Sequence, residues 1–160
     1  MKTKNTRKST TKGTICQDTF IREVRANYHM TGTQPFAISG PDDVATFVRS
    51  LLTDNSREHF FALYLDGSHQ VVSYSTISIG TANATTVHPR EVFQRAILAG
   101  AVAIVVAHNH PSGNLAPSEA DQVVTRRLRD AGEIVGIRLL DHLIINELAY
   151  RSIINDSGVK

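Results

Sequence analysis

The chain has 160 residues, of which 41% are hydrophobic and 20% charged, and a formal net charge of +2. This length suits one domain with a sizeable core, and the composition is that of an ordinary globular protein. No apolar run approaches the length of a membrane span, and the polar N-terminus lacks the apolar core of a signal peptide, which predicts a cytoplasmic protein with no membrane partner.

The first 14 residues form a basic segment with almost no apolar side chains, which we predict to be a disordered tail. Its basic residues, all of which precede the first acid, are Lys2, Lys4, Arg7, Lys8 and Lys12. Without them, 12 basic residues face 15 acidic ones, a net charge of −3. Weak, salt-sensitive contact with nucleic acid is one function for such a tail, and we favour the alternative of a solubilising terminus.

Residues 15–160 are predicted to form the folded domain, in which the single cysteine, Cys16, excludes an internal disulfide and a cysteine-rich metal site. Residues 19–28 suggest a strand, and residues 31–40 a loop. A helix should begin at Pro41 and end near Thr53, because apolar residues recur with helical spacing. The residues of this predicted buried face are Val44, Phe47, Val48, Leu51 and Leu52.

The next segment has the pattern of a β-hairpin. Residues 60–65 and 71–79 are rich in apolar and β-branched side chains, and Asp66-Gly67 between them is typical of a tight turn. We therefore predict two antiparallel strands, followed by a polar connection over residues 81–87.

A second helix should start at residues 88–91, where Pro89 is well placed in a first turn, and Gly100 should stop it. Its predicted buried side consists of Phe93, Ile97 and Leu98. Residues 101–107 then form an unbroken apolar run with four β-branched residues, which is typical of a central strand buried on both faces. Residues 108–113 follow it as a polar turn.

A third helix is predicted from about Ser118, with a turn over residues 132–136. Its expected buried face comprises Ala120, Val123, Val124, Leu128 and Ala131. Residues 137–145 should form a strand and residues 149–154 a short terminal element. The order of these elements mixes crossover and hairpin connections, which predicts an α/β fold with a mixed sheet flanked by helices.

The predicted metal site lies where the apolar run ends. His108 and His110 are two residues apart on an extended chain, so their imidazoles can point to one place, and Asp121 could supply a third donor. Zinc in hydrolytic sites typically takes three such protein ligands and leaves the fourth position to water.

A purely structural interpretation competes with this site. Ser118 and Asp121 have the spacing of a capping box, and a lone histidine at a strand end is usually a hydrogen-bonded structural residue. We favour the metal site because capping does not require His-x-His, Pro-Ser-Gly and Ser-x-x-Asp within fourteen residues.

The motif His108-Asn109-His110-Pro111, followed by Ser118-x-x-Asp121, resembles the JAMM metalloprotease motif. The segments 87–93, 108–117 and 140–145 are similar to the RadC branch of that family, and the resemblance covers roughly residues 18–155. It implies a JAMM fold, related to that of cytidine deaminases, and one Zn²⁺ per chain held by His108, His110 and Asp121.

The resemblance also implies a catalytic glutamate some forty to fifty residues before the histidine pair, where Glu58 stands. This residue would move protons between water and the leaving amine. Glu91 is the alternative, but its place in a first helical turn already explains it. The hydroxyl of Ser118 would help to stabilise the oxyanion in addition to capping the helix.

The remaining histidines are not predicted to be ligands, because the zinc of the family uses no further residues. Asp141 and His142 are interpreted as a hydrogen-bonded pair in or near the last strand. His88 is likewise no ligand, and His29, His59 and His69 are predicted to be surface residues.

The resulting hypothesis is a zinc-dependent hydrolase that cuts an amide or isopeptide bond of a peptide or protein substrate with metal-activated water. The alternative is a non-catalytic scaffold of DNA processing, since JAMM-like folds also occur without activity and the RadC name is tied to DNA repair. A zinc nucleoside deaminase is excluded, because it needs Pro-Cys-x-x-Cys and the chain has one cysteine. Substrate identity and oligomeric state do not follow from the sequence.

Overall fold

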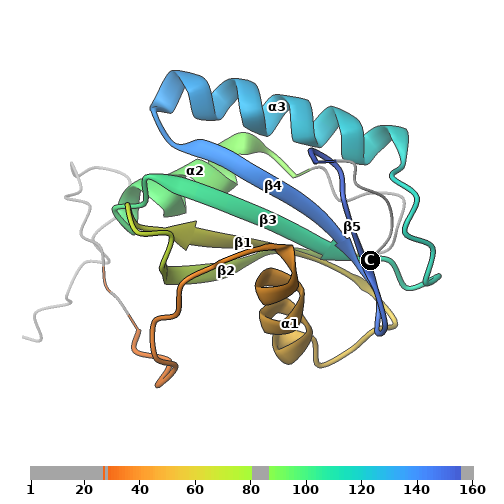
Figure 1. Ribbon diagram of the computed structural model, residues 1–160. Helices are drawn as coiled ribbons and strands as arrows, with labels where there is room; N and C mark the ends of the chain where they lie inside the picture. Colours follow the sequence, from red (N-terminus) through yellow and green to blue (C-terminus); the bar gives the residue numbers. More distant parts are fainter. Residues whose placement is uncertain (1–26, 28, 81–86, 156–160) are drawn as a thin grey trace, which may run out of the picture.

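A five-stranded mixed sheet forms the centre of the protein, with helices on both faces (Figure 1). The computed structural model describes residues 27, 29–80 and 87–155. The strands lie in the order β2-β1-β3-β4-β5, where β3 and β4 are parallel and the other neighbours antiparallel. This architecture confirms the predicted α/β class.

The helices and strands follow the predicted order. The strands are β1 (Glu58–Leu65), β2 (Val71–Gly80), β3 (Ala103–Asn109), β4 (Arg138–Ile145) and β5 (Tyr150–Ser152). The helices are α1 (Pro41–Leu51), α2 (Pro89–Leu98) and α3 (Glu119–Val135). Within the described part of the chain, no helix combines the length and hydrophobicity needed to cross a membrane.

Some predictions concern residues that the structure does not describe. The basic tail at 1–14 lies outside the described residues, as does the strand expected at 19–28 except for residue 27. Residues 81–86 of the expected connection also lie outside them.

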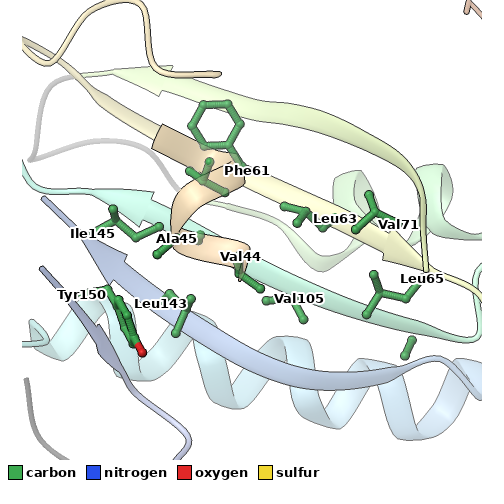
Figure 2. Close-up of a cluster of buried hydrophobic side chains, with 13 residues drawn as sticks. Val44, Ala45, Phe61, Leu63, Leu65, Val71, Val105, Leu143, Ile145 and Tyr150 are labelled. Carbon is green, nitrogen blue, oxygen red and sulfur yellow. The ribbon is translucent and has the colours of Figure 1, made fainter. Parts of the chain in front are cut away.

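The two faces of the sheet carry separate apolar cores because successive strand residues point to opposite sides. Helix α1 covers one face, and α2 and α3 cover the other (Figure 1). On β1, Phe61, Leu63 and Leu65 pack toward α1, as the cluster in Figure 2 shows. Phe60, Ala62 and Tyr64 pack in the core under α2 and α3.

Strand β3 occupies the middle of the sheet and is buried along its whole length. Its residues alternate between the two cores, with Val105 in the first and Ile104 and Val106 in the second. A strand covered on both faces has no solvent side and therefore reads as a continuous apolar run. The predicted central strand is confirmed.

The hairpin of β1 and β2 is antiparallel as predicted, but β1 begins two residues earlier than expected. This extension brings Glu58 and His59 into the sheet. His59 is only 7% exposed and stacks on Phe61 at a ring distance of 6.0 Å. Its prediction as a surface residue was wrong, because the strand period continues through it, whereas His29 and His69 are exposed as expected.

The buried side of α2 differs from the prediction. Val92, Phe93 and Ala96 are buried, whereas Ile97 is 59% exposed and Leu98 is 41% exposed. With about 100° of rotation per residue, Ile97 lies roughly 90° from the centre of the buried stripe and Leu98 lies on its far side. Of the predicted residues, only Phe93 belongs to the core.

Helix α3 continues through the turn that was predicted at residues 132–136 and ends at Val135. Gly132 serves close packing here, because a Cβ atom at this position would lie 2.5 Å from the carbonyl oxygen of Ile137 and 3.3 Å from the Phe93 ring. Gly136, at φ 77°, is the residue that ends the helix. Ala120, predicted to be buried, is exposed at the other end of α3.

Candidate metal centre

His108, His110 and Asp121 come together at the carboxyl end of β3. His108 is the last but one residue of this strand and is fully buried, and His110 follows directly after the strand. Asp121 reaches the same place from the first turn of α3. The strand and the helix that follows it thus bring together all three of the predicted ligands.

The three donor groups are spaced as one metal ion would require. The Nε2 atoms of His108 and His110 are 3.0 Å apart. His108 Nε2 lies 3.2 Å from Asp121 Oδ1, and His110 Nε2 lies 3.6 Å from Asp121 Oδ2. Tetrahedral ligands at zinc bond lengths of 2.0–2.1 Å stand about 3.3–3.4 Å from one another. The cluster could therefore bind a metal ion.

Both imidazoles direct their other ring nitrogen away from this point. His110 Nδ1 is hydrogen-bonded to the carbonyl oxygen of Asn114, which can only accept, so Nδ1 carries the proton. His108 Nδ1 is hydrogen-bonded to His142 Nε2 at 2.9 Å. Ligating histidines generally use the second nitrogen in this way.

Electrostatics of the cluster favours a bound cation. The Asp121 carboxylate, its hydrogen bond first of all, raises the pKa of His110 against the opposing effect of burial. Burial opposes ionisation of Asp121, but the imidazoles of His108 and His110 beside it hold the pKa of its carboxyl well below the usual range. A proton on His110 is one cation that satisfies the cluster, and a divalent metal is the other.

The capping contacts of the structural interpretation are present as well. Ser118 Oγ accepts from the Asp121 N–H at 3.1 Å, and Asp121 Oδ2 accepts from the Ser118 N–H at 2.8 Å. The Ser118 hydroxyl also lies 2.6 Å from Asp121 Oδ2 and donates to it. Capping therefore orients the carboxylate, whose Oδ1 faces His108. The two interpretations of Ser-x-x-Asp describe one arrangement.

Glu58 lies on the same face of the sheet as the histidines. Phe60 of β1 stands directly opposite His108 of β3 and stacks on its ring at 5.8 Å. Glu58 is two residues before Phe60 and so points to the same side, level with His110. The Glu58 charge contributes, after Asp121 and Asn114, to the raised pKa of His110.

Asn109 fixes the backbone on both sides of Glu58. Its Oδ1 accepts from the His59 N–H at 2.7 Å, and its Nδ2 donates to the Arg57 carbonyl at 2.9 Å. The residue is 3% exposed, so water competes little for these bonds. Sequence reasoning missed this role, although the residue stands between the two histidines.

Glu91 has the structural surroundings predicted for it. It lies in the first turn of α2, and its carboxylate contacts Arg90 and Arg95, each at 3.4 Å. His88 caps this helix by accepting from the Arg90 N–H at 3.1 Å. Both residues are thus explained by the start of α2.

The predicted pairing of Asp141 with His142 is confirmed, but only through the backbone. Asp141 Oδ1 accepts from the His142 N–H at 2.7 Å and from the Ser152 hydroxyl at 2.6 Å. The His142 ring contacts His108 and Thr125 instead. Thr125 was missed because a polar residue within an apolar helical stripe gives no pattern of its own.

A cavity of about 220 Å³ opens beside His110. Its lining includes Asn55, Asn109, Pro111, Gly113, Asn146 and Leu148. Asn146 Nδ2 donates to the Gly113 carbonyl at 2.9 Å and so connects the loop after β4 to the loop after β3. The candidate metal centre is therefore next to a space that a substrate could enter.

Comparison with known proteins matches residues 38–159 to the family described as RadC-like JAB domain. A UPF0758 protein of Desulforamulus reducens is 50% identical over 113 residues, which are 71% of this chain and 50% of the relative. One from Geobacillus sp. strain WCH70 is 48% identical over 118 residues, 74% of this chain and 52% of the relative. The chain thus spans about half the length of these curated relatives.

Proposed function

Because this chain belongs to the RadC-like JAB domain family, we propose that it is a zinc-dependent hydrolase that cuts an amide or isopeptide bond in a peptide or protein. The observation that carries the proposal is the meeting of His108, His110 and Asp121 at one point. The Nδ1 atoms of both histidines and the capping contacts of Asp121 face away from that point, so the two Nε2 atoms and Asp121 Oδ1 face it.

Zinc is proposed because of the donor set. Imidazole nitrogens suit zinc, and a carboxylate completes a three-ligand set of the kind found in hydrolytic zinc sites. A bound Zn²⁺ would supply Lewis acidity, making water nucleophilic near neutral pH and polarising the substrate carbonyl.

Glu58 is the proposed general base and acid. It is half-buried at the start of β1 and held by Asn109 through the flanking backbone. On the face shared with the histidines, its carboxylate would accept a proton from water and return it to the leaving amine. Glu91 is disfavoured because its carboxylate is already engaged with two arginines.

Ser118 is proposed to assist at the developing oxyanion. Its hydroxyl stands at the N-terminus of α3 and donates to Asp121 Oδ2. The same hydroxyl could turn its proton toward a developing oxyanion, and the positive end of the helix dipole would add to its effect.

Cleavage of a peptide and isopeptide library by the zinc-loaded wild type and by Glu58→Gln tests the function. Glutamine keeps the size of the side chain but cannot take the proton, so turnover should fall by roughly 10²–10⁴-fold while zinc and fold persist. Glu91→Gln is the matched control and should cost only about 0.3–1 kcal/mol of stability at the helix start.

Two outcomes would change the assignment. Loss of activity in Glu91→Gln with full activity in Glu58→Gln would make Glu91 the base. A wild-type protein that holds zinc but cleaves no member of the library would favour the non-catalytic scaffold.

A further inference from the structure

We propose that His142 and Thr125 are positioning residues that fix the tautomer of His108 in which Nε2, the nitrogen that faces the metal, is unprotonated. This inference rests on the proposed function, because it concerns a ligand of the proposed zinc. It assigns roles to two buried residues outside the motif that suggested the site.

The four residues involved form one continuous chain of hydrogen bonds. His108 Nδ1 lies 2.9 Å from His142 Nε2, and His142 Nδ1 lies 2.6 Å from Thr125 Oγ1. Thr125 Oγ1 lies 2.7 Å from the carbonyl oxygen of Asp121. The chain thus starts at one proposed ligand on β3, passes through β4, and returns through α3 to another proposed ligand.

The direction of each bond follows from its last acceptor. A carbonyl oxygen can only accept, so the single hydrogen of the Thr125 hydroxyl goes to Asp121. Thr125 Oγ1 must then accept from His142 Nδ1, which places the proton of a neutral His142 ring on Nδ1. His142 Nε2 is left with a lone pair and accepts from His108 Nδ1. His108 Nε2 is therefore unprotonated and free to bind a metal.

If every hydrogen bond in this series ran in the opposite direction, a proton would block the proposed metal site. If His142 Nε2 carried the proton, His108 Nδ1 would have to accept it, and the His108 proton would move to Nε2. That proton would point at His110 and Asp121, where the metal is proposed to bind. The Thr125 hydroxyl thus selects the tautomer that permits binding, acting through two imidazole rings.

Packing keeps the hydrogen-bonded residues in place. His108 and His142 are fully buried, and Thr125 is 6% exposed, so water cannot readily replace a partner. The Phe60 ring stacks on His108 at 5.8 Å and meets His142 edge-on at 5.3 Å. A threonine hydroxyl often bonds the carbonyl four residues earlier in a helix. Here the Thr125 hydroxyl oxygen also bonds His142 Nδ1, so the bond to the Asp121 carbonyl sets the tautomer of His142 as well.

The test compares Thr125→Val with Thr125→Ser. Valine has the shape of threonine without the hydroxyl, whereas serine retains it. Zn²⁺ affinity, measured by competition with a chromophoric chelator, should fall roughly 10–100-fold in Thr125→Val, the usual effect of losing an outer partner of a ligating histidine. Thr125→Ser should bind Zn²⁺ close to the wild-type value. Equal affinity in wild type and Thr125→Val would overturn the inference while leaving the proposed zinc site intact.

A second measurement needs no variant. In wild-type protein, ¹⁵N NMR of the imidazole rings should show His142 protonated at Nδ1 and His108 protonated at Nδ1. A His142 ring protonated at Nε2 would overturn the inference even if Thr125→Val failed to fold. A wild type that binds no Zn²⁺ yet shows the expected tautomers would instead contradict the proposed function alone.

Discussion

The two faces of the sheet are both well covered, yet their buried polar groups behave differently. On the α1 face, Asn109 bonds to backbone groups of β1 and Asp141 accepts from the Ser152 hydroxyl of β5, so both residues hold neighbouring strands together. On the α2 and α3 face, His108, His142 and Thr125 bond to one another, and His108 Nε2 still faces His110 and Asp121. Burial of a polar residue is thus no sign of function by itself. Three donor groups that gather at one place, as His108, His110 and Asp121 do, are such a sign.

The largest effect on stability is expected from the α1 face. Leu65 is fully buried there, at the opposite end of β1 from Glu58. Leu65→Ala should lower the free energy of unfolding by about 2–5 kcal/mol because it leaves a cavity, and Zn²⁺ affinity should not change. Urea denaturation and metal titration measure the two quantities.

Leu128→Ala provides the matched change on the other face. Leu128 is also fully buried and lies one turn after Thr125 on α3. A similar loss of stability is expected, together with weaker Zn²⁺ binding, since α3 carries Asp121. If Leu65→Ala weakened Zn²⁺ binding as much as Leu128→Ala did, metal binding would depend equally on both faces, and the proposed difference between them would be wrong.

A smaller effect is expected from pH. It concerns Zn²⁺ affinity and arises only from residues on the metal-binding face. Asp121 raises the pKa of His110 above its ordinary value. In the metal-free protein the His110 ring therefore stays protonated up to a higher pH than usual. Metal must displace that proton. Zn²⁺ affinity should therefore fall by about tenfold per pH unit below the raised pKa and level off above it.

Asp121 should not add to this slope, since its lowered pKa keeps the carboxylate ionised throughout the same range. Metal titration in a series of buffers from acidic to neutral pH checks the slope. Affinity that does not vary over this range would contradict the protonation assigned to His110.

Much of the fold was predictable because apolar periodicity survives in single segments. The hairpin, the central strand and α1 all follow from the spacing of their own residues. The wrong predictions concern residues whose burial depends on another segment that packs against them. Gly132 looked like a turn residue, but it is needed for the close approach of α3 to Ile137 and Phe93. Ile97 lies near a helix end, where the rotation of the buried stripe is set by packing.

The candidate site likewise contains residues that the local sequence could predict and residues that it could not. His108, His110 and Asp121 lie close in sequence, so their spacing could predict their meeting. His142 and Thr125 join them from β4 and from the middle of α3. Nothing in the local sequence of either residue shows that they share a hydrogen bond, because that contact depends on how α3 lies across the sheet. Asn109 was missed for the same reason, since its partners are backbone groups of β1.

Metal content is the most direct test of the central claim that these three residues form a zinc site. Protein purified without added metal should contain one zinc per chain by elemental analysis. His108→Ala and Asp121→Ala should each contain none, whereas Ser118→Ala, which removes a capping hydroxyl but no ligand, should retain it. A His108→Ala protein that still held one zinc per chain, or a folded wild type that held none, would contradict the account.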